Sequence, residues 1–489
     1  MTETLVGQAN RDRLLHIGVL KTCPQDIINL DDDARSISTA HNDTNRRDAV
    51  LCAFHRLGGD WQKSDSIEQA VPNLVSSLVP ILSLANVTDF DGQALIAEAA
   101  LACLELLSAS PYCLLDDPTL LLIISYTNTN DAWTTSFSCL LAARLLESRL
   151  LDDNLAQFIV GPVLKSYIRP KLSHSRSTTM SSGTTSNDWM QSDPSIPTIF
   201  GWSVEKANAA LLSQEWPLYL PVLLALIENS QLTVRTRGLD ILVTFIQKCS
   251  HNTLFSTGIS RVLEDAIFPT LFFLPSLTPE HDSAILLDLA YTALLKLAAA
   301  DSNPQSHARR RLLDRLIRHG IMAGYLHGSN YPAVVKVLMR SATAAISLLG
   351  FSAIKHIQDL VDILDSTMTD PFSPSYPSVA AAAGQVLDVL ISHCWPRLVG
   401  TRHTRRILAI LVACWLNVRE KMEELAEPSS AQDLYSLSQQ VVVLCKHLRA
   451  VSPHKDLKIP STLNDALSRH LQLAPLFGDC ESLQPADGA

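Results

Sequence analysis

The chain has 489 residues and a formal net charge of −10, which argues against general binding to nucleic acid because that function needs a basic face. Charged residues make up 18% of the sequence, below the roughly 25% of average soluble domains. We therefore expect a partner protein to cover part of an apolar outer surface. The alternative is that alanine-rich helices raise the mean hydropathy without leaving such a surface.

The first part of the chain, residues 1–170, is expected to form irregular helical repeats. One stripe of small and aliphatic residues, Ala97, Ala100, Leu101 and Leu104, shows the spacing of a helix with one buried face. The acidic run Asp31, Asp32 and Asp33 is interpreted as a solvated loop, since a cation site needs further oxygen ligands. Apolar periodicity predicts helices over residues 44–57, 67–85, 91–108, 132–149 and 153–168.

Residues 171–199 interrupt this pattern. Serine and threonine crowd the segment and apolar anchors are few, so we predict a disordered insertion. Such a segment is either a site of phosphorylation or, as most loops of this composition are, a solvated linker.

The block 200–475 shows the clearest repeats. Residues 216–247 form a helical hairpin, with a polar turn at 228–231 and Thr233 as the expected cap of the second helix. The first helix should bury Leu220, Leu223, Leu224 and Ile227. Similar pairs begin near residues 216, 262, 307 and 351, a spacing of about 45 residues that is typical of HEAT and armadillo units. A proline-rich loop at 370–378 separates the helices of the fourth pair.

These patterns predict an all-α fold, an α-solenoid of HEAT/armadillo-like helical hairpins. Two stripes mark inner helices: Leu286, Ala290, Ala293, Leu294 and Leu297, and then Ala383, Val386, Leu387 and Leu390. Further helices are expected at 404–425, 431–451 and 461–472, and residues 476–489 are expected to be a flexible tail.

Arginines are the candidate partner-binding residues. Two groups, one at 309–318 and one at 397–406, would form a basic patch for an acidic or phosphorylated partner segment if the fold brings them together. The alternative is a solvated face whose guanidinium groups pair with acids such as Asp301 and Asp314. The candidate partner-binding residues are Arg235, Arg237, Arg309, Arg310, Arg311, Arg315, Arg318, Arg402, Arg405 and Arg406.

Catalytic, cofactor and metal sites are not expected. The sequence has no glycine-rich phosphate loop, no GxSxG and no HExxH, and its ten cysteines are scattered without a CxxC pair. Cys394 with His393 or His403 is interpreted as a core thiol near an imidazole, not as a nucleophile with its base. The uncharged stretch 69–88 contains prolines and is interpreted as a core helix, and no secretory signal is recognised, so an intracellular protein without a membrane span is expected.

Several segments together resemble the Tel-two-interacting protein two family, in a fungal form. They are the run Leu220 to Ile227, the motif VRTRGL at 234–239, the run LEDAIFPTL at 263–271 and LPSLTPE at 274–280. The resemblance is firmest over residues 216–420. It implies a non-enzymatic HEAT-repeat subunit of the TTT co-chaperone complex, cytoplasmic and nuclear, which binds other large HEAT-repeat subunits and no small molecule. With the ninety-kilodalton heat-shock chaperone, that complex matures and stabilises phosphatidylinositol-kinase-related protein kinases.

A HEAT-repeat transport receptor or a phosphatase-type scaffold is the alternative function. A transport receptor of the karyopherin type is usually longer and more acidic along its inner face, and the sequence shows no such acidic run. Binding to a small nucleotide-switch GTPase would favour this alternative.

Overall fold

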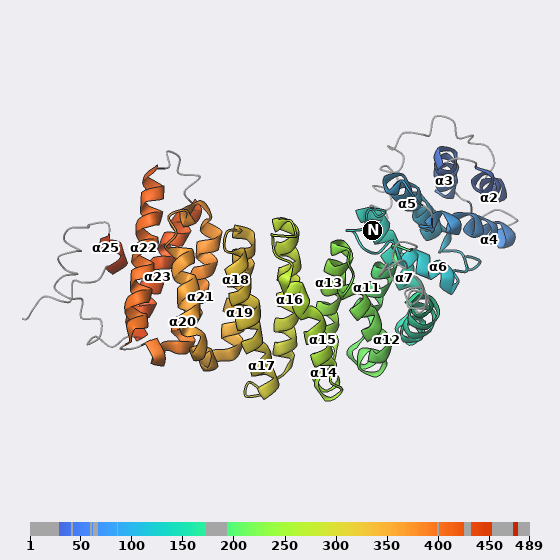
Figure 1. Cartoon of the computed structure of the whole chain (residues 1–489). Coiled ribbons are helices and arrows are strands. Elements are labelled where there is room, and N and C mark those ends of the chain that lie inside the picture. Colours follow the sequence, from blue (N-terminus) through green and yellow to red (C-terminus); the bar gives the residue numbers. More distant parts are fainter. Residues whose placement is uncertain are drawn as a thin grey trace, which may run out of the picture. The chain divides into compact units, whose positions relative to one another are not determined.

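The computed structural model describes residues 29–40, 43–58, 61, 67–85, 87–172, 193–398, 401–424, 432–451 and 473–477. Within these ranges the chain forms helices and no β-strand, which confirms the all-α prediction. The chain divides into two compact units, Met1–Leu226 and Ile227–Ala489. Figure 1 shows the helices of both units in sequence colours.

The first unit is built from helices that pack on near neighbours in the sequence. Helix α2 packs on α3 and α4, α5 packs on α3 and α7, and α11 packs on α6 and η3. The helices are α2 Leu30–Thr39, α3 Asp43–Leu57, α4 Ile67–Leu78, η2 Val79–Leu82, α5 Phe90–Leu107, α6 Asp117–Ile124, α7 Ser136–Arg149, α8 Asp152–Phe158, η3 Ile159–Ile168, α11 Ile196–Lys206 and α12 Ala209–Ile227.

All five helices predicted in this unit are present, with changes inside two of them. The helix expected over 67–85 tightens from α4 into the 3₁₀ turn η2 at Pro80, and the helix expected over 153–168 continues from α8 into the π-helical segment η3. The predicted stripe of α5 is confirmed, because Ala97, Ala100, Leu101 and Leu104 are all buried.

The predicted acidic loop at 31–33 is wrong. Asp31, Asp32 and Asp33 form the first turn of α2, and the side chain of Asn29 accepts a hydrogen bond from the Asp31 amide as the helix cap. Acidic residues are favourable in a first turn because the helix dipole is positive there. Helices α6 and α11 were not predicted either, since α6 is short and α11 begins inside the expected insertion.

The limits of the expected insertion also change. Residues 173–192 lie outside the described residues, whereas both flanks are folded. Lys171 is helical and forms an ion pair with Asp193, and Ile196 and Ile199 are buried in the first turns of α11. Because α11 packs on α6 and η3, it belongs to the first unit and not to the C-terminal block expected from residue 200.

The second unit contains successive hairpins, in which the first helices are α15, α17, α20 and α22 and the second helices are α16, α19, α21 and α23. Helix α13 packs on α16, and the second helices then pack on one another in chain order, from α16 through α19 and α21 to α23. The elements are α13 Leu232–Lys248, α14 His251–Ser256, α15 Ile259–Ile267, η4 Phe268–Phe272, α16 Glu280–Ala300, α17 His307–Arg315, η5 Leu316–Met322, α18 Ala323–Gly328, α19 Pro332–Leu349, η6 Gly350–His356, α20 Ile357–Met368, η7 Ser373–Ser375, α21 Pro377–Leu398, α22 Arg402–Glu424, α23 Gln432–Val451 and α25 Ala474–Phe477.

Several boundaries in this unit match the sequence prediction. Helices α22 and α23 confirm those expected at 404–425 and 431–451, and the proline-rich connection lies between α20 and α21. The helix expected at 461–472 lies outside the described residues. Glycine is needed at two turns where φ is positive, Gly258 (78°) before α15 and Gly350 (55°) after α19.

The buried faces are close to those predicted. The stripes of α16 and α21 are confirmed residue by residue. In α12 the buried face is rotated, because Tyr219, Val222 and Leu226 are buried while Leu220 and Leu224 lie at its margin. The cap expected from Thr233 is wrong: α13 begins after Gln231 without a side-chain cap.

Three stretches are long and apolar enough to cross a membrane by length and composition alone: Ala209–Ile227, Glu280–Ala300 and Pro332–Met368. The third is not one helix, since α19 and α20 are separated by the turn at Gly350. The stretch 69–88, which was considered from the sequence, spans α4 and η2.

Candidate protein-interaction surface

The first arginine group binds the preceding hairpin of the second unit. On α17, Arg311 Nη2 lies 3.1 Å from Glu264 Oε2, and Arg315 Nη1 lies 2.7 Å from Glu264 Oε1 and 3.0 Å from Asp265 Oδ1. The Arg315 guanidinium also covers the ring of Phe268 at 3.8 Å. Burial lowers the pKa of Arg315, but its hydrogen bonds to Glu264 and Asp265 outweigh that and raise it. Glu264 is buried, so these arginines neutralise a carboxylate that has little access to water.

Arg309 has a different role in the same group. Its Nη1 donates to the Asp301 carbonyl at 3.0 Å and its Nη2 donates to the Leu348 carbonyl at 3.1 Å. Both carbonyls lie at the C-terminal ends of helices, α16 and α19, where backbone acceptors lack helical partners and a cation is favourable. The guanidinium therefore holds two helix ends together. The expected pairing with the Asp301 carboxylate is replaced by a bond to its backbone.

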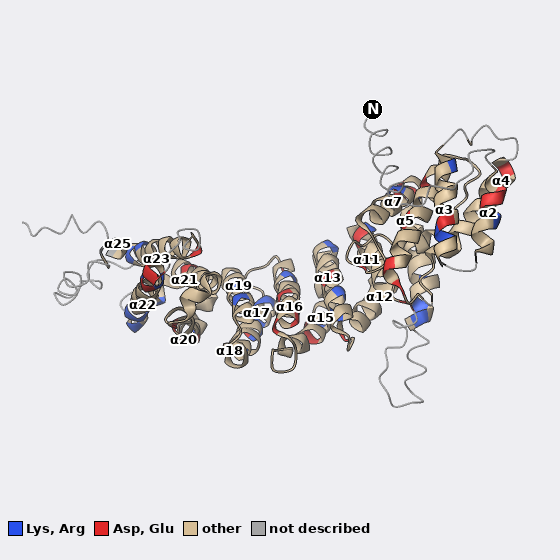
Figure 2. Cartoon of the chain, turned by 90° about the horizontal axis from the view of Figure 1, so that it is seen from above, with Lys and Arg blue, Asp and Glu red and all other residues tan. Residues whose placement is uncertain are grey.

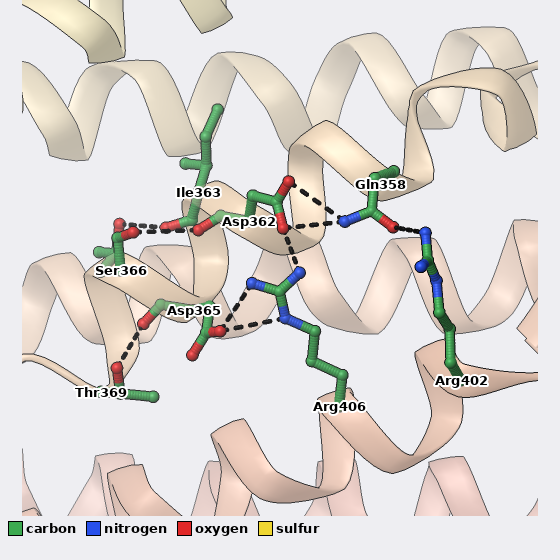
Figure 3. Close-up of polar contacts among 9 residues, drawn as sticks. Gln358, Asp362, Ile363, Asp365, Ser366, Thr369, Arg402 and Arg406 are labelled. Carbon is green, nitrogen blue, oxygen red and sulfur yellow. Dashed lines mark hydrogen bonds and ion pairs between the residues drawn. The ribbon is translucent and has the colours of Figure 1, made fainter.

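The second arginine group repeats this arrangement two hairpins later. Arg406 on α22 lies between Asp362 and Asp365 of α20, with Nη2 2.8 Å from Asp365 Oδ2 (Figure 3). The hydrogen bond to Asp365 is the main reason why the pKa of Arg406 lies above its ordinary value. Arg402 Nη2 donates to Gln358 Oε1 at 2.9 Å, and Gln358 in turn donates to Asp362.

A third cluster of ion pairs lies between the two arginine groups along the chain. Its basic residues were not among those predicted from the sequence. Lys355 and His356 on η6 both bind Asp314 of α17, His356 through Nε2 at 2.9 Å. His356 is buried, and burial lowers its pKa against the opposing effect of Asp314. The sequence analysis expected an arginine to pair with Asp314. In the structure a lysine and a histidine of the next hairpin bind it instead.

Together these contacts form what we call the carboxylate ladder: Glu264 and Asp265, then Asp314, then Asp362 and Asp365, each bound by basic residues of the following hairpin. The paired ionic residues are separated by 41 to 51 positions in the sequence. That separation matches the spacing of the hairpins. Acidic and basic residues that recur at this interval are therefore the sequence signal by which the ladder could have been predicted. Figure 2 shows both charge signs along the second unit.

Two further candidates lie on α13. Arg235 Nε donates to the Asn229 carbonyl at 3.0 Å, and its guanidinium covers the ring of Phe273 at 4.3 Å. Burial lowers the pKa of Arg235. Arg237 binds Asp240 one turn along the same helix at 3.0 Å. Both arginines therefore have local structural partners.

Three predicted cations keep their charge available to solvent. Arg310, Arg318 and Arg405 form no side-chain hydrogen bond or ion pair within the described part of the chain. The structure does not bring the two arginine groups into one unpaired basic patch, since each contributes to a different junction of the ladder. The role of these three residues in partner binding stays a prediction.

A groove lies beside the first junction. It lies between α14, α15 and α17 and is lined by both signs of charge, including Arg261, His307, Glu264 and Asp301. No group of three or more metal-ligating side chains occurs among the described residues. Burial raises the pKa of the Cys394 thiol to about 11, which disfavours the nucleophilic thiolate at neutral pH.

The fold and these contacts define a class: an all-α protein of consecutive hairpins, tied by charge pairs at a repeating sequence interval. The Tti2 family model matches residues 119–375, more than half of the 489 residues. The chain belongs to the Tti2 family. The match begins further upstream than the resemblance described from the sequence over residues 216–420, and it ends earlier, at residue 375. Family membership implies a component of the TTT complex that assembles with partner proteins.

Proposed function

We propose that the chain is a non-catalytic scaffold subunit of the TTT co-chaperone complex. In this role it supports the maturation and stability of phosphatidylinositol-kinase-related protein kinases together with the heat-shock chaperone. The match to the Tti2 family over residues 119–375 is the observation that carries the proposal. Its site of action is the cytoplasm and the nucleus.

The architecture that fits this role is a solenoid of HEAT-type hairpins. The succession of contacts from α13 to α23 supports it, because each second helix packs on the next along the chain. The ladder supports it too, since ion pairs recur at the hairpin interval. An array of this kind offers a long surface for many small contacts with another large protein and needs no deep pocket.

Depletion of the protein tests the role in kinase stability. We expect the steady-state amounts of several such kinases to fall together while their messenger RNAs stay constant, because newly made kinases would lack the assembly that stabilises them. Quantitative mass spectrometry of depleted and rescued cells measures this. Unchanged kinase amounts after complete depletion would contradict the proposal.

Affinity purification tests the assembly itself. We expect two large helical-repeat proteins to co-purify with the full chain in stoichiometric amounts. The same experiment tests the predicted role of Arg310, Arg318 and Arg405 in partner binding. For this purpose the three residues are replaced with glutamate. Recovery of a small GTPase in place of the large subunits would instead favour the transport-receptor alternative.

A further inference from the structure

The connections inside three successive hairpins of the second unit each expose a large apolar side chain. These residues are Leu277 between α15 and α16, Leu326 in α18, and Phe372 between α20 and α21, with exposed fractions of 93%, 76% and 74%. Phe272 and Tyr376 add further apolar surface in the first and third connections. We call these five residues the apolar edge. In Figure 1 α18 lies at the upper edge of the second unit, and α17 begins at the lower edge.

The acidic side chains at the apolar edge belong to its first and third connections, and Arg235 of α13 covers the Phe273 ring in the first. The connections with their flanks, residues 268–282, 323–333 and 367–378, contain no lysine or arginine, whereas Glu280, Asp282 and Asp370 lie in them. At the opposite edge lie Arg309, Arg310 and Arg311 in the first turns of α17, then Lys355, and then the group at 397–406, and several of these cations are paired with acids of the carboxylate ladder. Among these segments, lysine and arginine therefore occur at the opposite edge and not in the connections of the apolar edge.

The apolar edge is held in place by hydrogen bonds. Asp370 Oδ1 accepts a bond from the Phe372 amide at 2.9 Å, and Asn417 Nδ2 donates to the Thr369 carbonyl at 3.2 Å. Glu280 Oε1 accepts a bond from the Ala333 amide at 2.9 Å, which links the first connection to the start of α19. A surface ordered in advance loses little conformational entropy when a partner binds.

The distance between neighbouring connections is similar to the distance between residues seven positions apart in an α-helix. The second helices α16, α19 and α21 pack side by side, and packed helices lie about 8–10 Å apart. In an α-helix, residues seven positions apart lie on similar faces and are separated by about 10.5 Å, from a rise of about 1.5 Å per residue. One helix laid across the edge can therefore place an apolar residue on each connection.

We propose that the apolar edge binds a basic amphipathic helix of a partner protein. The helix carries apolar residues seven positions apart that contact Leu277, Leu326 and Phe372 in turn, and lysines or arginines beside them that face Glu280, Asp282 and Asp370. This inference goes beyond membership of the complex, because it assigns one surface and the chemistry of the segment that binds there.

A designed peptide tests the proposal on the full-length chain. The probe is a fluorescein-labelled helical peptide of three heptads with leucine at every seventh position and lysines flanking this stripe. A second peptide replaces each lysine with glutamate, and a third keeps the composition but scrambles the leucine positions. Fluorescence anisotropy gives the dissociation constant of each peptide.

The key variant combines Leu277→Ser, Leu326→Ser and Phe372→Ser, which changes exposed side chains only. The control variant combines Phe351→Ser and Val443→Ser, whose exposed fractions of 60% and 59% are comparable but which lie away from the apolar edge. Circular dichroism and thermal melting verify that both variants are folded.

We expect the basic heptad peptide to bind the wild type and the control alike, and to bind the triple variant at least about tenfold more weakly, because the lost side chains are the anchors. The acidic and scrambled peptides should bind weakly to all three proteins. Equal binding to the triple variant, equal binding of the acidic peptide, or no binding of the basic peptide would each overturn the proposal. Because the probe is synthetic, such a failure leaves the test of TTT assembly by co-purification unaffected.

Discussion

Asp33 shows how the fold changes the chemistry of a single residue. It lies in the first turn of α2, is almost fully buried, and forms an ion pair with Arg56 of α3. Burial raises the pKa of Asp33 from 3.8 to about 6, with Arg56 acting in the opposite direction. The carboxylate is therefore charged at neutral pH at a cost to the folded state.

The pH dependence of stability follows from this shift. Between about pH 4 and pH 6 the folded protein keeps the Asp33 proton that the unfolded chain releases, so the free energy of unfolding falls as pH rises and then levels off. Asp33→Asn has no proton to lose. We expect the free energy of unfolding of the variant, relative to that of the wild type, to rise by roughly 2–3 kcal/mol from pH 4 to pH 7, because the pKa of Asp33 is shifted by about two units.

Urea unfolding of the wild type and the variant over this pH range measures the difference. Asp32→Asn is the comparison variant: it removes an exposed negative charge from the same turn, and since Asp32 contributes to the raised pKa of Asp33, it should reduce the pH dependence only in part. A difference between Asp33→Asn and the wild type that is the same at every pH would show that Asp33 has an ordinary pKa.

At the scale of elements, the carboxylate ladder joins each first helix to the following hairpin. At the junction of α15 and α17 the buried Glu264 depends on two arginines that are themselves partly exposed. Replacing Arg311 and Arg315 together with methionine leaves Glu264 buried and unpaired. We expect a loss of about 2–3 kcal/mol, less than the 3–5 kcal/mol of a fully buried pair because water reaches this site.

The same junction offers its own controls. Adding Glu264→Gln to the double arginine variant should restore most of the lost stability, since the uncompensated charge is gone. Arg310→Met on the same helix should change stability by less than about 0.5 kcal/mol, as expected for a surface residue. Urea unfolding of the four proteins measures these effects. If adding Glu264→Gln leaves the double arginine variant as unstable as before, the assignment is contradicted.

Glycines in the two π-helical segments differ in what surrounds them. A Cβ at Gly320 in η5 would lie 3.2 Å from both Leu271 Cδ1 and Tyr291 Oη, whereas one at Gly161 in η3 would meet no atom within 4 Å. We expect Gly320→Ala to destabilise the protein by about 1–3 kcal/mol through overpacking. Gly161→Ala should instead stabilise it by about 0.5–1 kcal/mol, because alanine favours helix and restricts the unfolded chain.

Thermal or urea unfolding of the two glycine variants gives the comparison. Equal effects of the two substitutions would mean that Tyr291 and Leu271 do not confine the backbone of η5. The result reports on packing between α16 and the first helix of the next hairpin, because Tyr291 belongs to α16.

At the scale of the whole molecule, the solenoid proposal predicts how the chain responds to truncation. Ending the chain after Leu398 removes α22 and α23, which pack on α20 and α21. We expect amide exchange to accelerate in α20 and α21 and to stay unchanged in α13 and α16, because each unit of a repeat array is stabilised mainly by its neighbours.

Hydrogen exchange followed by mass spectrometry on the full and truncated chains measures this response. A uniform loss of protection across residues 232–398 would indicate one globally cooperative core and would contradict the solenoid.

Periodicity allowed the sequence to predict the helices and most of their buried faces. Stripes such as that of α16 are visible because a helix with one buried face repeats apolar residues every three to four positions. The sequence also identified the arginine groups, and the resemblance of several short motifs to a known family indicated the family that the family model confirms. It missed α2, because an acidic run at a helix start and an acidic loop have the same composition.

The tertiary structure alone decided what the arginines do. Arg311, Arg315 and Arg406 look like solvent-exposed charges in the sequence because their acidic partners lie one hairpin earlier, 41 to 51 residues away. It also decided that Leu277, Leu326 and Phe372 share one edge, since only folding places three distant connections side by side. Local periodicity determines which face of a helix is buried, but the neighbours of a charge or of an exposed side chain depend on how hairpins pack, and packing joins residues that are far apart in the chain.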